Sequence, residues 1–140
     1  MKRKDFINQL SKLVSFRTVT RTFEENKKAL DYIVSLLDKR IFLERNTVNG
    51  FEYLKASVSN TGKPNICYMV HVDVVFGKDD QFLMKMEGGK AIGRGTSDMK
   101  FSIPIGIALI NEAMEKGIDF DLVVTTDEEV GGFDGGKVIA

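Results

Sequence analysis

The stretch DFDLVVTTDEEVGG, residues 119–132, joins an uninterrupted apolar segment to a row of acids. Its centre, Leu122–Val124, is apolar at consecutive positions, which is typical of a β-strand covered on both faces. Helical and strand-like patterns alternate along the rest of the chain. We therefore expect an α/β fold, a three-layer α/β/α sandwich with helices packed on both sides of a mixed sheet.

The elements around this strand can be placed from hydrophobic spacing and turn residues. Helices are expected over residues 3–14, after Thr22, and from about Ser102 to Gly117. Thr22 and Glu25 have the spacing of a capping box. Asn49-Gly50 predicts a β-hairpin, NICYMV (65–70) a strand, and QFLMKM and KAIG two short strands. GGKVIA (135–140) has the pattern of a helix's first turn, and its abrupt stop suggests a piece of a longer protein.

Composition excludes several classes of protein. The 140 residues are 43% hydrophobic, which is enough for one core, and 20 acidic residues balance 20 basic ones. This balance gives no general attraction to nucleic acid or to an anionic membrane. No signal peptide or membrane span is expected, and the single cysteine, Cys67, lies in an apolar run. We expect a buried, reduced thiol and a cytoplasmic location.

The first motif that could carry chemistry is HVDVV, residues 71–75, which contains the only histidine. In an extended chain, His71 and Asp73 face the same way, so the carboxylate can orient the imidazole as a metal ligand. The C-terminal ends of strands are also where open α/β sheets bind ligands. The alternative is a histidine with satisfied hydrogen bonds and no catalytic role, which is the commoner case for an isolated motif of this kind.

The second motif is GRGTSDMK, residues 93–100, a glycine-rich loop that ends just before an expected helix. A phosphate-binding loop is a weak interpretation, because the spacing matches neither the dinucleotide nor the P-loop fingerprint. Asp98 is a candidate metal ligand. Equally, its charge would suit the dipole at the start of a helix.

The third motif, TTDEEVGG (125–132), places adjacent carboxylates at the end of the buried strand. Neighbouring unpaired carboxylates repel one another, and a divalent cation would remove this repulsion. Of the adjacent pair Glu128 and Glu129, one could bind metal while the other transfers a proton. A solvated acidic turn is the alternative. Taken together, histidine, aspartate and glutamate at strand ends and a helix start suit a zinc site.

HVDVV, GRGTSDMK and TTDEEVGG, in this order and spacing, resemble the family of acetylornithine deacetylase, succinyl-diaminopimelate desuccinylase and carboxypeptidase G. Its members are di-zinc metallopeptidases and amide hydrolases. The similarity covers essentially the whole chain. It implies the zinc exopeptidase catalytic fold, with residues 1–140 as the N-terminal part of that domain. It also implies hydrolysis of an amide or peptide bond in a dipeptide or N-acyl amino acid.

The resemblance assigns roles to five side chains. His71 resembles a ligand of one zinc, and Asp73 the residue that orients it. Asp98 resembles the carboxylate that bridges both metals. Glu128 resembles the general base and Glu129 a ligand of the second zinc. Two zinc ions are therefore expected for a complete site, and cobalt or manganese would suit the same mixed nitrogen and oxygen ligands.

The chain also departs from the family pattern. Phe76 stands where the family has proline, and Phe101 where it has glycine. The family has a cis peptide after the bridging aspartate, here Asp98–Met99. Further metal ligands and a lid and dimerisation domain would lie beyond Ala140, so the longer protein would be a homodimer. We expect residues 1–140 alone to bind zinc weakly and to hydrolyse nothing at a useful rate.

Two alternatives remain from the sequence. One is a diverged or truncated family member that acts as a binding or structural module without catalysis. The other is a nucleotide-binding α/β protein that uses the glycine-rich loop, which is disfavoured because no glycine fingerprint joins a first strand to a first helix.

Overall fold

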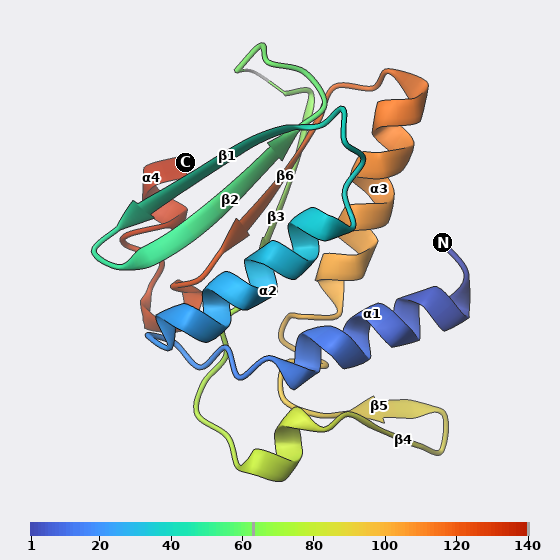
Figure 1. Cartoon of the computed structure of the whole chain (residues 1–140), viewed down its shortest axis with the longest axis vertical. Coiled ribbons are helices and arrows are strands. Elements are labelled where there is room, and N and C mark those ends of the chain that lie inside the picture. The colour runs from blue at the N-terminus through green and yellow to red at the C-terminus, as the bar shows by residue number, and fades with distance from the viewer. Residues whose placement is uncertain (63, 140) are drawn as a thin grey trace.

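The computed structural model describes residues 1–62 and 64–139 (Figure 1). The long helices are α1 (Arg3–Ser15), α2 (Phe23–Ser35) and α3 (Ser102–Lys116), and α4 (Gly136–Ile139) is short. The strands are β1 (Phe42–Val48), β2 (Phe51–Ser57), β3 (Ile66–His71), β4 (Lys85–Glu87), β5 (Lys90–Ile92) and β6 (Phe120–Thr125). Single 3-10 turns cover Asp79–Phe82 and Glu128–Val130. The expected helices and strands are present, except that Gln81 and Phe82 of the strand expected over QFLMKM belong to a 3-10 turn and β4 begins only at Lys85; Ala140 lies outside the described residues.

The main sheet is mixed, with the strand order β1-β2-β6-β3. β1 and β2 form the hairpin predicted from Asn49-Gly50, both of which have positive φ. β2 and β6 are antiparallel, whereas β3 and β6 are parallel, with His71 opposite Thr125. The α/β class with a mixed sheet is thus confirmed. Because β3 and β6 run in parallel, the first and third motifs emerge side by side.

One hydrophobic core joins the three long helices to one face of the sheet. Figure 1 shows α2 in front of the strands and α4 behind them, on the other face. All six residues of β6 are buried, as its continuous apolar centre predicted. The core includes Leu13 of α1, Leu30 and Ile33 of α2, Leu54 of β2, Val70 of β3, Ile103 and Ile107 of α3, and Leu122 and Val124 of β6.

Cys67 is exposed, so the prediction of a buried thiol was wrong. The Cys67 side chain points to the face of β3 opposite to that of the core residue Val70, and β3 has a neighbouring strand, β6, on one side only within the described residues. Ile66 and Met69 on the same strand are exposed as well. The apolar sequence of β3 resembled that of a central strand, and nothing local distinguished the two cases. None of the described helices has the length and hydropathy to cross a membrane.

The capping box predicted for α2 does not form. Thr22 is the N-cap residue, but its hydroxyl accepts no hydrogen bond from the N–H groups of the helix and donates to the carbonyls of Arg17 and Val19. The carboxylate of Glu25 accepts from the Arg17 N–H at 3.2 Å and pairs with Lys28 at 2.6 Å. Residues 17–22 form a turn that places the Arg17 and Val19 carbonyls next to the Thr22 hydroxyl, and the Arg17 N–H next to the Glu25 carboxylate.

Lys100, the last residue of the glycine-rich motif, accounts for the glycine at position 95. It is fully buried, and its Nζ donates to the carbonyls of Leu13 at 2.9 Å and Phe16 at 2.8 Å, at the end of α1. Its stem passes Gly95, where an added Cβ would lie 2.8 Å from the lysine Cδ. Burial lowers the pKa of Lys100 to about 7, against the opposing charges of Glu25 and Asp73. Lys100 therefore ties the loop before α3 to the end of α1.

Replacing Lys100 with methionine is expected to lower the free energy of unfolding by about 2 kcal/mol. Methionine fills similar space but leaves the Leu13 and Phe16 carbonyls without this donor. The matched control is Lys116→Met on α3, which removes only an exposed pair with Glu112 and should cost less than about 0.5 kcal/mol. Urea unfolding monitored by circular dichroism measures both, and equal midpoints for the two variants would contradict the role of Lys100.

Candidate active site

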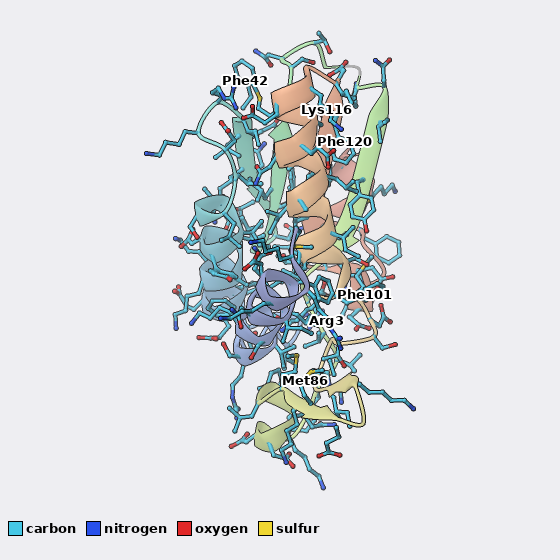
Figure 2. The ribbon with its side chains drawn as sticks, turned by 90° about the vertical axis from the view of Figure 1, so that its right-hand side faces the viewer. Arg3, Phe42, Met86, Phe101, Lys116 and Phe120 are labelled. Carbon is cyan, nitrogen blue, oxygen red and sulfur yellow. The ribbon has the colours of Figure 1, made fainter. Side chains whose placement is uncertain are left out.

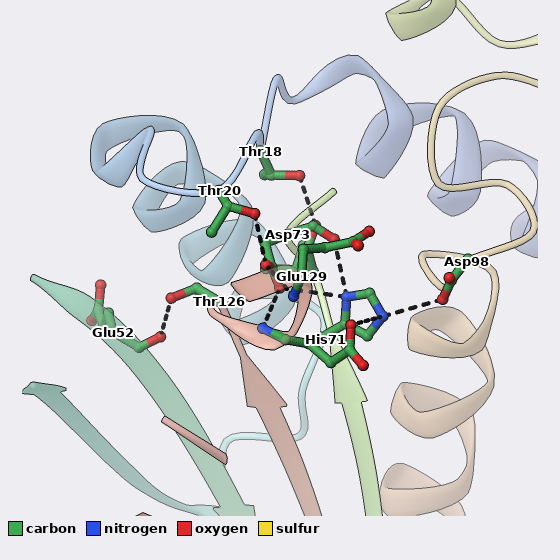
Figure 3. A network of polar contacts seen from close by, with 10 residues as sticks. Thr18, Thr20, Glu52, His71, Asp73, Asp98, Thr126 and Glu129 are labelled. Carbon is green, nitrogen blue, oxygen red and sulfur yellow. Dashed lines mark hydrogen bonds and ion pairs between the residues drawn. The ribbon is translucent and has the colours of Figure 1, made fainter. Parts of the chain in front are cut away.

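Three chain segments meet at one end of the sheet (Figure 3). His71 is the last residue of β3, and Glu128 and Glu129 begin the turn directly after β6. Asp98 lies in the loop that leads into α3, which packs against both strands. The parallel pairing of β3 with β6 therefore brings together motifs that lie far apart in the sequence.

His71 lies between two sets of oxygen atoms. Its ring is buried, and Nδ1 faces Asp73, at 3.0 Å from the backbone carbonyl and 3.4 Å from Oδ1. On the other side of the ring, Nε2 lies 3.2 Å from Oδ1 of Asp98 and 3.6 Å from Oε2 of Glu128. The backbone of Asp73, as well as its carboxylate, thus orients the imidazole. The structure brings His71, Asp98 and Glu128 together as the sequence suggested.

The electrostatic surroundings of His71 favour a charged imidazole. Burial lowers the pKa of His71, but the hydrogen bonds and charge of Asp73, together with the charge of Glu128, raise it to about 9. At neutral pH both ring nitrogens therefore carry protons and can donate, one toward Asp73 and one toward Asp98. A bound cation would take the place of the proton on Nε2.

Asp73 makes more contacts than the sequence indicated. Its side chain is 0% exposed. Its Oδ1 accepts from the N–H of Glu128 at 3.2 Å, and its Oδ2 accepts from the N–H of Glu129 at 3.2 Å. Oδ2 also accepts from the hydroxyl of Thr20 at 3.0 Å. Asp73 therefore orients His71 and also anchors the turn that carries the two glutamates.

Sequence reasoning missed the contribution of residues 18–20. Val19 pairs with Val74 in a parallel β-bridge, flanked by hydrogen bonds from the Val74 N–H to Thr18 O and from the Thr20 N–H to Val74 O. The buried hydroxyl of Thr18 donates to the carbonyl of Val72 at 2.6 Å. The alternation of threonines in T-V-T was a weak signal for an extended segment with both hydroxyls on one side.

The position of Glu129 agrees less well than that of His71 or Asp98 with its expected role as a metal ligand. Burial raises the pKa of its carboxyl group, while His71 and the Val75 N–H favour the charged form. These influences place it in the neighbourhood of the site. However, in the described structure no hydrogen bond or ion pair joins its carboxylate to His71 or Asp98 (Figure 3).

The remaining acid of the third motif, Asp127, is part of the loop's framework. It is fully buried, and its Oδ2 accepts from the N–H groups of Asp134 at 2.9 Å and Gly135 at 2.7 Å. A Cβ at Gly135 would lie 2.6 Å from Oδ1 of Asp127, so glycine allows this close approach. The chain after the strand thus folds back over the acidic turn, which the sequence did not reveal.

The site opens into a cavity of about 330 Å³. The peptide bond Asp98–Met99 is cis, as the family resemblance implied, and the Asp98 side chain is 77% exposed. Neither Phe76 nor Phe101 lines this cavity. Phe101 lines a separate groove with Arg3 and Met86 on another part of the surface (Figure 2). The cavity is lined by Met69, Val70, His71, Asp98, Met99, Thr125, Glu128, Gly132 and Gly136.

The donor atoms fit a divalent transition metal in type and spacing. Zinc bonds nitrogen and oxygen at about 2.0–2.2 Å, so two tetrahedral ligands lie about 3.3–3.5 Å apart. The 3.2 Å between His71 Nε2 and Asp98 Oδ1 is close to that value, and it also suits a hydrogen bond. Over residues 1–62 and 64–139, no three His, Cys, Asp or Glu side chains are grouped so that they could hold a metal. The chain thus offers neighbouring donors rather than a complete ligand set.

Comparison with known proteins identifies the family. The profile of Peptidase family M20/M25/M40 matches residues 67–140, which is more than half of the chain and includes all three motifs. The chain belongs to this family. The resemblance stated from the three motifs is therefore confirmed.

Curated M20 relatives include succinyl-diaminopimelate desuccinylases. The enzyme of Rickettsia canadensis is 32% identical over 140 residues, covering 89% of this chain and 36% of that protein. The enzyme of Rickettsia prowazekii is 31% identical over 141 residues, with the same coverage. This M20 chain thus spans about a third of the length of the relatives that it matches.

Solved structures show the same M20 fold. Human carnosine dipeptidase 1 superimposes with a TM-score of 0.80 at 15% identity, covering 97% of this chain and 34% of that chain. The metallo-carboxypeptidase Sso-CP2 from Sulfolobus solfataricus gives 0.76 at 18% identity, covering 96% and 33%. These likenesses show the same α/β fold with a mixed sheet.

Proposed function

We propose that this chain is the N-terminal, metal-binding part of the catalytic domain of a hydrolase that cleaves an amide or peptide bond. The meeting of His71 Nε2 with the carboxylates of Asp98 and Glu128, at the mouth of a cavity, carries the proposal. The substrates we propose are dipeptides or N-acyl amino acids. Succinyl-diaminopimelate is the first to test, given the names of the relatives.

His71, Asp98 and Glu129 are the side chains that would hold the metal. Two zinc ions are proposed, and cobalt or manganese would suit the same donors. When bound, the ions supply Lewis acidity, which lowers the pKa of a water molecule and polarises the substrate carbonyl. Asp73, held by four donors, fixes the direction of the imidazole toward the cavity.

Glu128 is the proposed general base. Its side chain is 59% exposed, and its carboxylate lies beside His71 without the buried hydrogen bonds that hold Asp73 and Asp127. An exposed and movable carboxylate can accept a proton from a water and pass it to the leaving nitrogen. The backbone N–H of Glu128 is bound to Asp73, so the turn stays fixed while the side chain moves.

We also propose that the other ligands, and a lid and dimerisation domain, belong to the part of the relatives' length that this chain does not span. Residues 1–140 alone would then bind zinc weakly and show no useful hydrolysis. Isothermal titration of the chain with zinc chloride should give dissociation constants above about 10 μM, because a tetrahedral site needs three or four ligands. Tight binding of two zinc ions would contradict this arrangement.

The function itself can be tested in a chimera. Residues 1–140 are joined to the part of the Rickettsia canadensis desuccinylase that follows the matched region. With zinc present, the chimera should release succinate from succinyl-diaminopimelate, and chelation by EDTA should abolish the release. A folded chimera that is inactive with zinc, cobalt and manganese, on acylated amino acids and dipeptides alike, would favour the alternative of a non-catalytic binding module.

A further inference from the structure

Thr20, in the N-terminal third of the molecule, donates a hydrogen bond from its side chain to the buried carboxylate of Asp73. We propose that Thr20 is a positioning residue, whose hydroxyl sets the orientation of Asp73 and, through it, both His71 and the Glu128–Glu129 turn. The purpose of this positioning rests on the proposed function, but the positioning itself can be tested without it.

The two oxygen atoms of Asp73 have different partners. Oδ1 faces Nδ1 of His71 at 3.4 Å and accepts from the N–H of Glu128 at 3.2 Å. Oδ2 accepts from the hydroxyl of Thr20 at 3.0 Å and from the N–H of Glu129 at 3.2 Å. Rotation of the carboxylate about its Cβ–Cγ bond would weaken both sets together. Thr20 adds a donor to Oδ2 from outside the turn, and so resists that rotation.

Thr20 is itself held rigidly in place. Its N–H donates to the carbonyl of Val74, and the neighbouring residue Val19 bridges Val74 in parallel. The hydroxyl therefore approaches Asp73 from a segment that is hydrogen-bonded to both Val72 and Val74, the residues on either side of Asp73. A hydroxyl on a fixed backbone can direct a carboxylate more effectively than one on a mobile loop.

The burial of Asp73 makes the hydrogen bond from the Thr20 hydroxyl important. Asp73 is 0% exposed, so no water is at hand to replace a lost hydrogen bond. Without the hydroxyl, Oδ2 keeps a single donor, the Glu129 N–H. The carboxylate can then turn, and the imidazole of His71 and the Glu128–Glu129 turn would lose their fixed relation.

Thr22 provides a matched control. It is the same residue type in the same segment, and its hydroxyl donates to the carbonyls of Arg17 and Val19, away from the site. Thr20→Val and Thr22→Val each remove one hydroxyl and keep a β-branched shape. Thr20→Ser keeps the hydroxyl and should behave like the unmodified chain. Thr20→Ala removes the hydroxyl without a new methyl group, in case valine disturbs packing.

The experiment is NMR on ¹⁵N-labelled chains. His71 is the only histidine, so its ring nitrogen signals are assigned without ambiguity. In Thr20→Val and Thr20→Ala we expect shifted His71 ring signals and about tenfold faster amide exchange at Glu128 and Glu129. Thr22→Val and Thr20→Ser should leave these signals unchanged. If the Thr20→Val signals match those of Thr22→Val, the proposal is wrong.

A zinc titration of the same samples separates this inference from the proposed function. If the signals change as expected and zinc binds about tenfold more weakly to Thr20→Val, both are supported. If the signals change but zinc binds none of the chains, even at millimolar concentration, the positioning role stands and the metal site fails. If zinc binds every variant equally and no signal moves, only the positioning role fails.

Discussion

Glu128→Gln in the zinc-loaded chimera is expected to lower kcat by about 10³-fold while leaving zinc affinity nearly unchanged. Glutamine keeps the shape of glutamate but cannot accept a proton, and general base catalysis contributes about 10²–10⁴-fold. The Glu128 side chain is also exposed, so the substitution leaves no buried group unpaired. Initial rates of succinate release give kcat, and calorimetric titration gives the zinc affinity.

The matched control is Glu87→Gln, an exposed acid on β4 that is outside the cavity lining. It should leave kcat unchanged. Loss of zinc binding in Glu128→Gln would show that Glu128 is a metal ligand instead of the base. An unchanged kcat would remove Glu128 from the mechanism.

Asp73→Ala is expected to lower the free energy of unfolding by about 3–5 kcal/mol, the largest stability effect that we predict. The change leaves the Glu128 and Glu129 N–H groups and the Thr20 hydroxyl without their shared acceptor, and leaves the His71 ring only the backbone carbonyl at this position. These donors are buried or partly buried, so water replaces the carboxylate poorly. Urea unfolding at pH 7 measures the difference.

Asp121→Ala is the comparison for that experiment. Asp121 is also a buried aspartate of the sheet region, 3% exposed, but its one ion pair among the described residues is with Lys55, whose side chain is 25% exposed. Removal of this pair should cost about half as much, because Lys55 can turn to solvent. Equal losses for the two variants would mean that burial alone, and not the shared contacts of Asp73, determines the cost.

Much of the site's location could be predicted from single segments. The apolar run Leu122–Val124 indicated a central strand, and the acids after it had to lie at its C-terminal end. The His71-x-Asp73 spacing placed an imidazole and a carboxylate on one side of a second strand. Sheet order was not encoded in either segment. The adjacency of β3 and β6, which brings the motifs together, follows from tertiary pairing.

The features that were missed depend on contacts between distant residues. Cys67 and Val70 belong to the same apolar run, yet only the latter is buried, because their side chains point to opposite faces of β3 and only that of Val70 packs into the core. Neither Thr20 nor Lys100 was assigned a role from the sequence. Their roles depend on acceptors 53 and 84–87 positions away, which no local pattern reveals.

The hydrogen bonds that converge on Asp73 also bear on when the site is assembled during folding. They link positions 53, 55 and 56 residues apart, so the carboxylate leaves water only after three distant stretches have docked. Contacts of such long range form slowly, because chain closure must precede them. A cation that binds the residues held together by Asp73 could bind only after they have come together, which is late on the folding pathway. It would prolong the lifetime of the native chain while hardly accelerating its formation.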